Sequence, residues 1–244
     1  MIEIIPIKER VEEKTVDTEK VFYIDNSHGT SMAEKYNYAI ENIILKSDDP
    51  IVCFRHNDTF ICTPNDVCDY KLEKLFEKHT VGIAGDTVGI AGVIGTIALD
   101  RSCCWWHGVI NAGGRQNFGS GSIIQGGLNE MCQVIEYPMN DHPGVHDYLA
   151  TVDGCCLFFP KWIFEEDLRF DENLKDYHFY DSDISLQVLE RGYKVSTIDI
   201  KIKHYSQGVP PKQFEDLRKV FFAKWDKKVE GQWPISRLSK FKKD

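Results

Sequence analysis

Residues 20–58, KVFYIDNSHGTSMAEKYNYAIENIILKSDDPIVCFRHND, contain the pattern on which the fold prediction rests. Residues 20–25 form an apolar run that ends in turn residues, and residues 51–54 have the composition of a buried strand. Between these runs, Ser31 and Glu34 have the spacing of a capping box, and apolar residues recur at helical intervals. The order strand, helix, strand predicts a parallel βαβ unit, in which ligands bind beyond the carboxyl ends of the strands.

Further apolar runs extend this unit on both sides. Residues 2–7 are predicted to form a strand parallel to residues 20–25, and a glycine-rich region at 81–98 continues the sheet. Later strands are expected at 152–159 and 195–202, and later helices at 67–78, from Trp162 onward and at 183–191. The expected fold class is α/β, with a mostly parallel sheet flanked by helices in a single domain.

Composition restricts the class of protein. The chain has 244 residues, 42% of them hydrophobic, and no apolar run near the ~20 residues needed to span a bilayer. The net charge of −9 argues against a large nucleic-acid interface. The amino terminus lacks the features of a signal peptide, so we expect a cytoplasmic protein whose eight cysteines are reduced. No Cys-x-x-Cys pair is present, which argues against a structural zinc site.

The last segment differs from the rest in charge. We divide the chain into a domain at 1–208 and a basic, amphipathic, helical tail at 209–244, where ten basic residues face five acidic ones between Lys212 and Asp244. Aromatic and aliphatic side chains recur in the tail at helical spacing: Phe214, Leu217, Phe221, Phe222 and Trp225. The helix is expected either to dock on the core or to contact anionic lipid or another polyanion.

Two histidines and an aspartate are predicted to meet at one edge of the sheet. Asp58 lies just past a predicted strand, His56 lies two residues earlier, and His204 follows the last predicted strand. Carboxylate and imidazole ligands suit Mn²⁺ or Mg²⁺. The alternative is that Asp58 forms a turn or caps a helix and that His204 bonds to a neighbouring loop.

Two carboxylates stand at a predicted helix start, in Tyr180-Asp-Ser-Asp183. There the helix dipole favours the ionised forms of Asp181 and Asp183, so either can serve as a general base. The alternative is that both only cap the helix. Trp105 and Trp106 could form a platform for a sugar ring; because neighbouring strand residues point to opposite sides, at most one is expected to face the site, and burial of both is the alternative.

Taken in order, these segments resemble the family-2-related glycosyltransferases of GT-A fold. The resemblance covers roughly residues 21–208 and rests most on His56-Asn-Asp58, His178-Phe-Tyr-Asp-Ser-Asp183 and His204-Tyr-Ser-Gln-Gly208. The resemblance also includes residues 31–37, residues 81–85 or the similar segment at 88–92, and residues 105–106, 152–154, 170–172 and 192–195. It implies transfer of a hexosyl or pentosyl group from a nucleotide-sugar donor, with an Asp general base and inversion.

The resemblance also implies roles for single residues. Asp58 matches the metal-binding aspartate of a DxD-type motif whose first acidic position is taken by His56, and His204 matches a late histidine that completes the metal shell. The implied donor-binding residues are Asp25, Asn37, Asp153 and Gly154. Asp181 matches the catalytic base, with Asp183 able to exchange roles, and His178 joins Trp105 and Trp106 on the acceptor or sugar side.

The sequence departs from the family at residues 8–20, where thirteen residues, nine of them charged, replace a full helix. This departure affects the nucleotide-binding half, so the nucleotide is less defined than the reaction class. The acceptor stays open among a glycan, a lipid-linked sugar, a protein and a modified DNA base. Two other functions are considered: a non-catalytic carbohydrate-binding or nucleotide-sugar-binding relative, and a metallohydrolase built on His56, Asp58 and His204.

Overall fold

The computed structural model describes residues 1–7, 20–27, 31–77, 86–106, 119–126, 133–137, 147–206 and 213–243, with the backbone alone for 133–137. Three expectations fall partly outside these residues. They are the strand at 81–85, most of the charged segment at 8–20, and much of the glycine-rich loop that follows Trp106.

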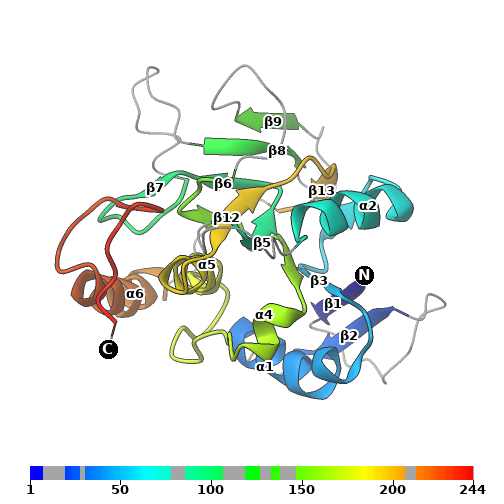
Figure 1. Ribbon diagram of the computed structural model, residues 1–244, viewed down its shortest axis with the longest axis horizontal. Helices are drawn as coiled ribbons and strands as arrows, with labels where there is room; N and C mark the ends of the chain where they lie inside the picture. The colour runs from blue at the N-terminus through cyan, green and yellow to red at the C-terminus, as the bar shows by residue number, and fades with distance from the viewer. Residues whose placement is uncertain are drawn as a thin grey trace.

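The main sheet has the strand order β12-β5-β11-β3-β1-β2 (Figure 1). Strand β1 runs parallel to both β2 and β3, which confirms the predicted βαβ unit. Strand β11 runs antiparallel to β3 and β5, and β12 is parallel to β5, so the sheet is mixed. The strands are β1 (Ile2–Ile7), β2 (Val21–Asp25), β3 (Ile51–Arg55), β5 (Val88–Gly92), β11 (Cys156–Pro160) and β12 (Lys194–Thr197).

A second sheet lies above the first in Figure 1 and has the order β10-β6-β8-β13-β4, with β9 paired to β8. Its strands are β4 (Thr59–Ile61), β6 (Ile94–Thr96), β8 (Gly119–Gln125), β9 (Gln133–Tyr137), β10 (Thr151–Val152) and β13 (Ile202–His204). A small third sheet joins β7 (Ala98–Leu99) to β14 (Ile235–Ser236).

Helices cover both faces of the main sheet. Alternate residues of β3 enter two apolar clusters: Val52 and Phe54 pack with α1, α5 and α6, whereas Ile51 and Cys53 pack with α2. The α/β class with flanking helices is therefore confirmed. The helices are α1 (Met32–Asn42), η1 (Ile44–Lys46), α2 (Asn65–Leu75), α4 (Trp162–Glu165), α5 (Tyr180–Glu190) and α6 (Phe214–Lys228).

Two predicted strands are each broken between the two large sheets. The run at 152–159 becomes β10 and β11, separated by a turn at Asp153-Gly154-Cys155, and the run at 195–202 becomes β12 and β13. Helix α5 begins at Tyr180, three residues earlier than expected, so Asp181 and Asp183 lie in its first turn. These breaks place polar residues at the junction of the sheets, where a continuous strand would have buried them.

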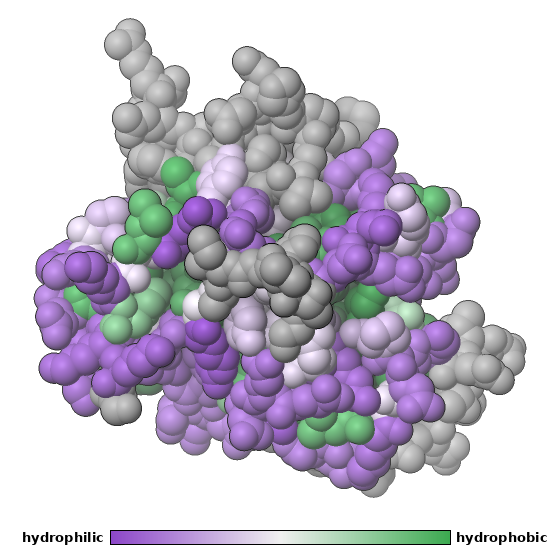
Figure 2. Space-filling view, viewed as in Figure 1, coloured by the Kyte–Doolittle hydropathy of each residue, from purple (hydrophilic) through white to green (hydrophobic). Residues whose placement is uncertain are grey.

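The tail helix α6 docks beside α5 (Figure 1), and Phe214, Leu217, Phe221 and Trp225 are all buried in the core. On the face in Figure 2, hydrophilic side chains predominate and hydrophobic ones form small separate groups. The structure thus agrees with the core-docking alternative for these four side chains. Among the described residues, no helix has both the length and the apolar composition needed to cross a bilayer.

Candidate functional site

The His-x-Asp turn connects β3 of the main sheet to β4 of the second sheet. The backbone N–H of His56 donates to the carbonyl of Cys155 at 3.0 Å, and Thr59 N–H donates back to the His56 carbonyl at 3.2 Å. The carbonyl of Asp58 accepts from Tyr205 N–H at 2.9 Å. The turn is therefore tied to the segment after β10 and to the end of β13, which hold the other polar residues of the site.

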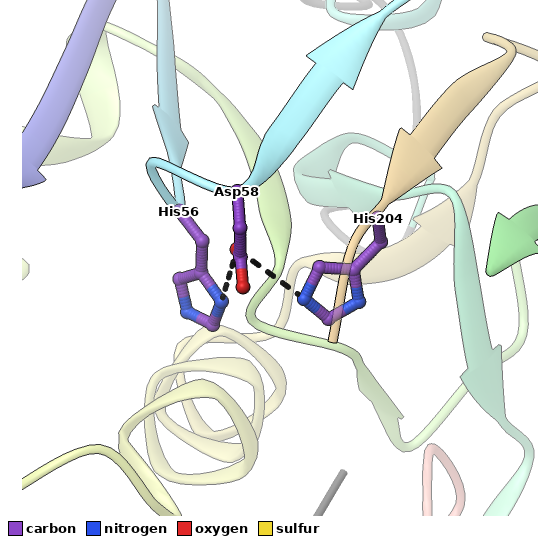
Figure 3. Close-up of side chains that lie close together, drawn as sticks. All are labelled: His56, Asp58 and His204. Atoms are coloured by element: carbon purple, nitrogen blue, oxygen red, sulfur yellow. Dashed lines mark ion pairs between the residues drawn. The ribbon is translucent and has the colours of Figure 1, made fainter. Parts of the chain in front are cut away.

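Three side chains converge at this turn, with Asp58 between two imidazoles (Figure 3). Asp58 Oδ1 lies 3.5 Å from His204 Nε2 and 4.0 Å from His56 Nδ1. One ligand atom from each of the three residues lies within 4.8 Å of the others. The structure thus brings together the metal-ligating residues expected from the sequence.

The cluster fits a divalent cation. Asp58 Oδ1 and His204 Nε2 are buried, and apart from their 3.5 Å ion pair with each other neither has a hydrogen-bond partner, which is costly for polar atoms unless a ligand satisfies them. Ligands at about 2.1 Å from an octahedral ion lie about 3 Å apart when adjacent and about 4.2 Å apart when opposite. The observed separations need only small side-chain movements to reach these values.

The protonation states of the cluster also favour a cation. Burial, followed by the neighbouring His204, lowers the pKa of His56, so this ring is neutral near neutral pH. Burial opposes ionisation of Asp58, but His204 and His56 outweigh it and lower the pKa of the carboxyl. For His204, burial is outweighed by Asp58 and Asp153, which raise the pKa, so a proton competes with a cation for this ring.

A buried tyrosine connects the cluster to the turn between β10 and β11. The hydroxyl of Tyr180 donates to the carbonyl of Gly154 at 2.9 Å, and His56 Nε2 lies 2.7 Å from the same hydroxyl oxygen. A Cβ atom at position 154 would stand 2.2 Å from that oxygen. Glycine is thus required here by the close approach of the tyrosine.

Asp181, the next residue, holds the other polar group of Gly154. Its Oδ2 accepts from Gly154 N–H at 3.0 Å, and its Oδ1 accepts from Ser182 N–H at 2.8 Å. Burial, and then the charge of Asp153, raise the pKa of Asp181 to about 7. A partly buried carboxyl with such a pKa is matched to general-base chemistry near neutral pH.

Asp153 precedes Gly154 in the turn after β10 and interacts with both the metal-ligating cluster and Asp181. Its Oδ1 accepts from Cys155 N–H at 2.8 Å, which shapes the turn after β10. Its charge influences His56, His204 and Asp181 alike. The two residues expected in the sugar pocket, Asp153 and Gly154, therefore adjoin both the metal-ligating cluster and Asp181.

The structure does not bring Asp183 to this site, contrary to the expectation that it could exchange roles with Asp181. Its side chain is fully buried, and Oδ1 accepts from Trp225 Nε1 at 2.8 Å and pairs with Lys224 Nζ at 2.7 Å. Oδ2 accepts from Gln187 Nε2 at 2.8 Å. With both oxygens engaged between α5 and α6, the carboxylate faces the core.

The two remaining donor-side residues, Asp25 and Asn37, hold backbone segments in place. Asp25 ends β2 and its Oδ1 accepts from Ser27 N–H at 2.7 Å. Asn37 Nδ2 donates to the Phe170 carbonyl and to Glu172 Oε1, each at 2.9 Å, and Oδ1 accepts from Phe170 N–H at 2.9 Å. The side chain of Asn37 thus fastens α1 to the segment before α5.

The aromatic residues expected on the acceptor side meet at the start of α6. The rings of Trp106 and His178 lie 5.8 and 5.2 Å from that of Phe214, and Trp105 stands edge-on to Trp106 at 6.0 Å. Both tryptophans are partly buried. They lie in a turn, so the expected strand alternation does not apply to them.

The residue that sequence reasoning missed is Tyr180. In the sequence, Tyr180 belongs to the segment that contains Asp181, and an aromatic residue at a helix start usually indicates core packing. Its adjacency to Asp181 was the available signal. Its contact with His56, 124 positions away, becomes visible only in the fold.

The sequence profile of the glycosyltransferase-like family matches residues 13–225. Among curated proteins, none matches the chain. Among solved structures, the chain is similar to that of GalNAc-T7 with UDP, GalNAc and Mn²⁺, at 8% identity and a TM-score of 0.45. That similarity covers 93% of this chain and 42% of that chain, so this chain spans less than half of that protein's length. Because the family profile matches most of the sequence, the chain belongs to the glycosyltransferase-like family.

Proposed function

We propose that this protein is a metal-dependent glycosyltransferase of GT-A type that uses a nucleotide-sugar donor. The observation that carries the proposal is the His56, Asp58 and His204 cluster, linked through Tyr180 to Asp181 in a member of this family. Two imidazoles beside one carboxylate favour Mn²⁺ over Mg²⁺, because Mg²⁺ prefers oxygen ligands. A bound cation would neutralise charge that develops on the pyrophosphate of the leaving nucleotide.

The protein residues divide the remaining work. His56, Asp58 and His204 would hold the cation, and Asp153 and Gly154 would line the sugar pocket beside it. Asp25, at the carboxyl end of β2, would contact the nucleoside. Trp105, Trp106 and His178 would line the acceptor side, where aromatic faces suit the apolar face of a sugar.

We assign the general base to Asp181. Its raised pKa and partial exposure allow it to take a proton from an acceptor hydroxyl, which attacks the donor from the opposite side and inverts the anomeric centre. Asp183 is assigned a structural role, because both of its oxygens are engaged in the core. Asn37 is likewise assigned to fastening α1.

The metallohydrolase alternative draws on the same cluster, since two histidines and a carboxylate can also hold a cation that activates water. A non-catalytic binding relative would need no base, so the environment of Asp181 argues against it.

The test has two stages. Calorimetry first measures binding of UDP, GDP and CDP with and without Mn²⁺; a transferase should bind one of them in a metal-dependent way. The matching nucleotide sugars are then incubated with panels of glycans, lipid-linked sugars, proteins and hydroxymethylated DNA. Sugar recovered on an acceptor with inverted configuration supports the proposal. If only free sugar is released, at a rate that no acceptor changes, the result would support the metallohydrolase alternative.

A further inference from the structure

We propose that Tyr180 is a positioning residue that keeps the proton of the neutral His56 ring on Nε2 and so presents the Nδ1 lone pair to the cation position beside Asp58. The proposal concerns how the site is prepared before any cation arrives. Its metal-binding consequence rests on the function proposed above, whereas its claim about the ring proton does not.

The hydrogen bonds of Tyr180 indicate which nitrogen of His56 carries the ring proton. A tyrosine hydroxyl has one proton to donate, and Tyr180 gives it to the carbonyl of Gly154 at 2.9 Å. His56 Nε2 lies 2.7 Å from the same oxygen, and with the hydroxyl proton assigned to the Gly154 carbonyl this nitrogen is the donor in the pair. A neutral imidazole carries one proton, and Nδ1 is therefore left with its lone pair.

The surroundings hold the ring of Tyr180 in place. Tyr180 is 1% exposed, and its ring packs against those of Tyr36 and Phe170 at 5.8 and 6.2 Å. Because a Cβ at Gly154 would be only 2.2 Å from the hydroxyl oxygen, the carbonyl approaches more closely than any other residue type would permit. The Gly154 carbonyl is thus held within hydrogen-bond distance of the hydroxyl.

The opposite side of the ring is consistent with this arrangement. His56 Nδ1 lies 4.0 Å from Asp58 Oδ1, too far for a hydrogen bond. An Nδ1 proton would instead favour a shorter contact with this carboxylate. A lone pair facing a carboxylate across this gap is favourable only when a cation lies between them, which is the position that His204 Nε2 also faces.

Gly154 connects Tyr180 to the proposed base, Asp181. Its carbonyl accepts from Tyr180, and its N–H donates to Asp181 at 3.0 Å. Tyr180 and Asp181, consecutive residues in the first turn of α5, therefore bind the carbonyl and the N–H of Gly154, respectively. The orientation of the ligand His56 and that of Asp181 are set by the same short segment.

The experiment uses full-length protein with ¹⁵N-labelled histidine, and resonances are assigned with His56→Gln. Without metal at pH 8, the wild type should show His56 protonated on Nε2, with a slowly exchanging ring proton. Tyr180→Phe should shift the ring toward the Nδ1-protonated form, which can donate to Asp58. Tyr193→Phe, which loses a surface hydroxyl bonded to Glu166, is the matched control and should leave His56 unchanged.

Titration with Mn²⁺ alone and with Mn²⁺ plus UDP gives the second readout. Tyr180→Phe should lower Mn²⁺ affinity about tenfold to hundredfold, as loss of a ligand's supporting hydrogen bond typically does. A wild-type His56 protonated on Nδ1, or a Tyr180→Phe spectrum identical to the wild type, would overturn the proposal, and the wild-type spectrum decides the first point even if the variant is unstable. Absence of Mn²⁺ binding by the wild type would refute the proposed metal site and leave the tautomer result to decide the role of Tyr180.

Discussion

The carboxylate of Asp181 accepts the backbone N–H of Gly154 at 3.0 Å, within the turn that separates β10 from β11. This bond fixes a partly buried carboxyl one residue away from the tyrosine that contacts His56. The break in the predicted strand at Asp153 is what makes the contact possible, because a continuous strand would have used this N–H in a ladder. The proposed base and the proposed metal ligands are thus joined through one turn.

Replacing Asp181 by Asn should abolish most turnover while preserving the fold. Asn keeps the shape of the side chain but cannot take a proton, and loss of a general base costs about a hundredfold to ten-thousandfold in rate, or roughly 3 to 5.5 kcal/mol of barrier. Asn has one acceptor oxygen for the two N–H groups of Gly154 and Ser182, but it also removes a charge that is costly in the folded state, so the melting temperature at pH 8 should change little. Steady-state transfer and thermal melting measure these two effects.

If Asp181 only caps α5, the result will be different, since Asn is nearly as good a cap as Asp. Near-normal kcat with unchanged donor affinity would then remove the base role. Donor affinity is measured separately by calorimetry, so that weakened binding is not mistaken for slower chemistry.

The pH dependence of kcat should report Asp181. With a pKa of about 7, the base is ionised above that pH and protonated below it, so kcat should rise with pH through this region at saturating Mn²⁺ and donor. Asp153→Asn removes the neighbouring charge that helps to raise this pKa. The acidic limb of the variant should therefore move to lower pH, and a limb that stays in place would mean that another group controls it.

Asp183→Ala should destabilise the protein without changing Mn²⁺ affinity. The change leaves Trp225 Nε1 without its acceptor and removes one of the two carboxylates bound to Lys224, and breaking a buried pair typically costs about 3 kcal/mol or more. Urea unfolding measures the loss. Asp216→Ala is the matched control, because its exposed pair with Lys219 on α6 is worth little. Lost turnover at unchanged stability would return Asp183 to the chemistry.

Much of the fold could be predicted because it depends on local patterns. The βαβ opening followed from two apolar runs around the capped helix at Ser31, whose Oγ accepts from Glu34 N–H at 3.4 Å. The metal-ligating cluster followed from one rule, that strand ends gather at a sheet edge. His56, Asp58 and His204 stand at such ends, although His204 belongs to the second sheet.

The remaining features depend on distant contacts that no local pattern encodes. Asp181 and Asp183 look alike in the sequence, yet one faces Gly154 and the other faces Trp225 on a helix some forty positions later. The run at 152–159 is apolar throughout its later part, so its break at Asp153 is decided by pairing with two different sheets. The partners of Tyr180 are hidden for the same reason.

Asp58→Ala should abolish metal-dependent nucleotide binding and leave the fold intact. The carboxylate lies between both histidines, whereas its side chain is 38% exposed and contributes little to the core. Calorimetry with Mn²⁺ and the nucleotide that binds the wild type measures the loss. Asp48→Ala, an exposed aspartate before β3, should bind as the wild type does. Unchanged binding by Asp58→Ala would remove the residue from the metal site.

His204→Ala should lower Mn²⁺ affinity by about tenfold, or roughly 1.4 kcal/mol, because it removes one ligand among several that include water and nucleotide oxygens.

The His204→Ala variant should also change how Mn²⁺ binding depends on pH. In the wild type, Asp58 and Asp153 raise the pKa of His204, so protonation of this ring displaces the cation as the pH falls through that raised value. Without the ring, this proton competition disappears. Mn²⁺ titrations from pH 6 to pH 8.5 should therefore show a shallower pH dependence in His204→Ala than in the wild type. His56, whose pKa is lowered, competes less for protons than His204 does, and its replacement by Ala should lower affinity with a smaller change in slope. Equal slopes in His204→Ala and the wild type would show that the cation does not compete with a proton at this ring, and His204 would then lose its place in the metal shell.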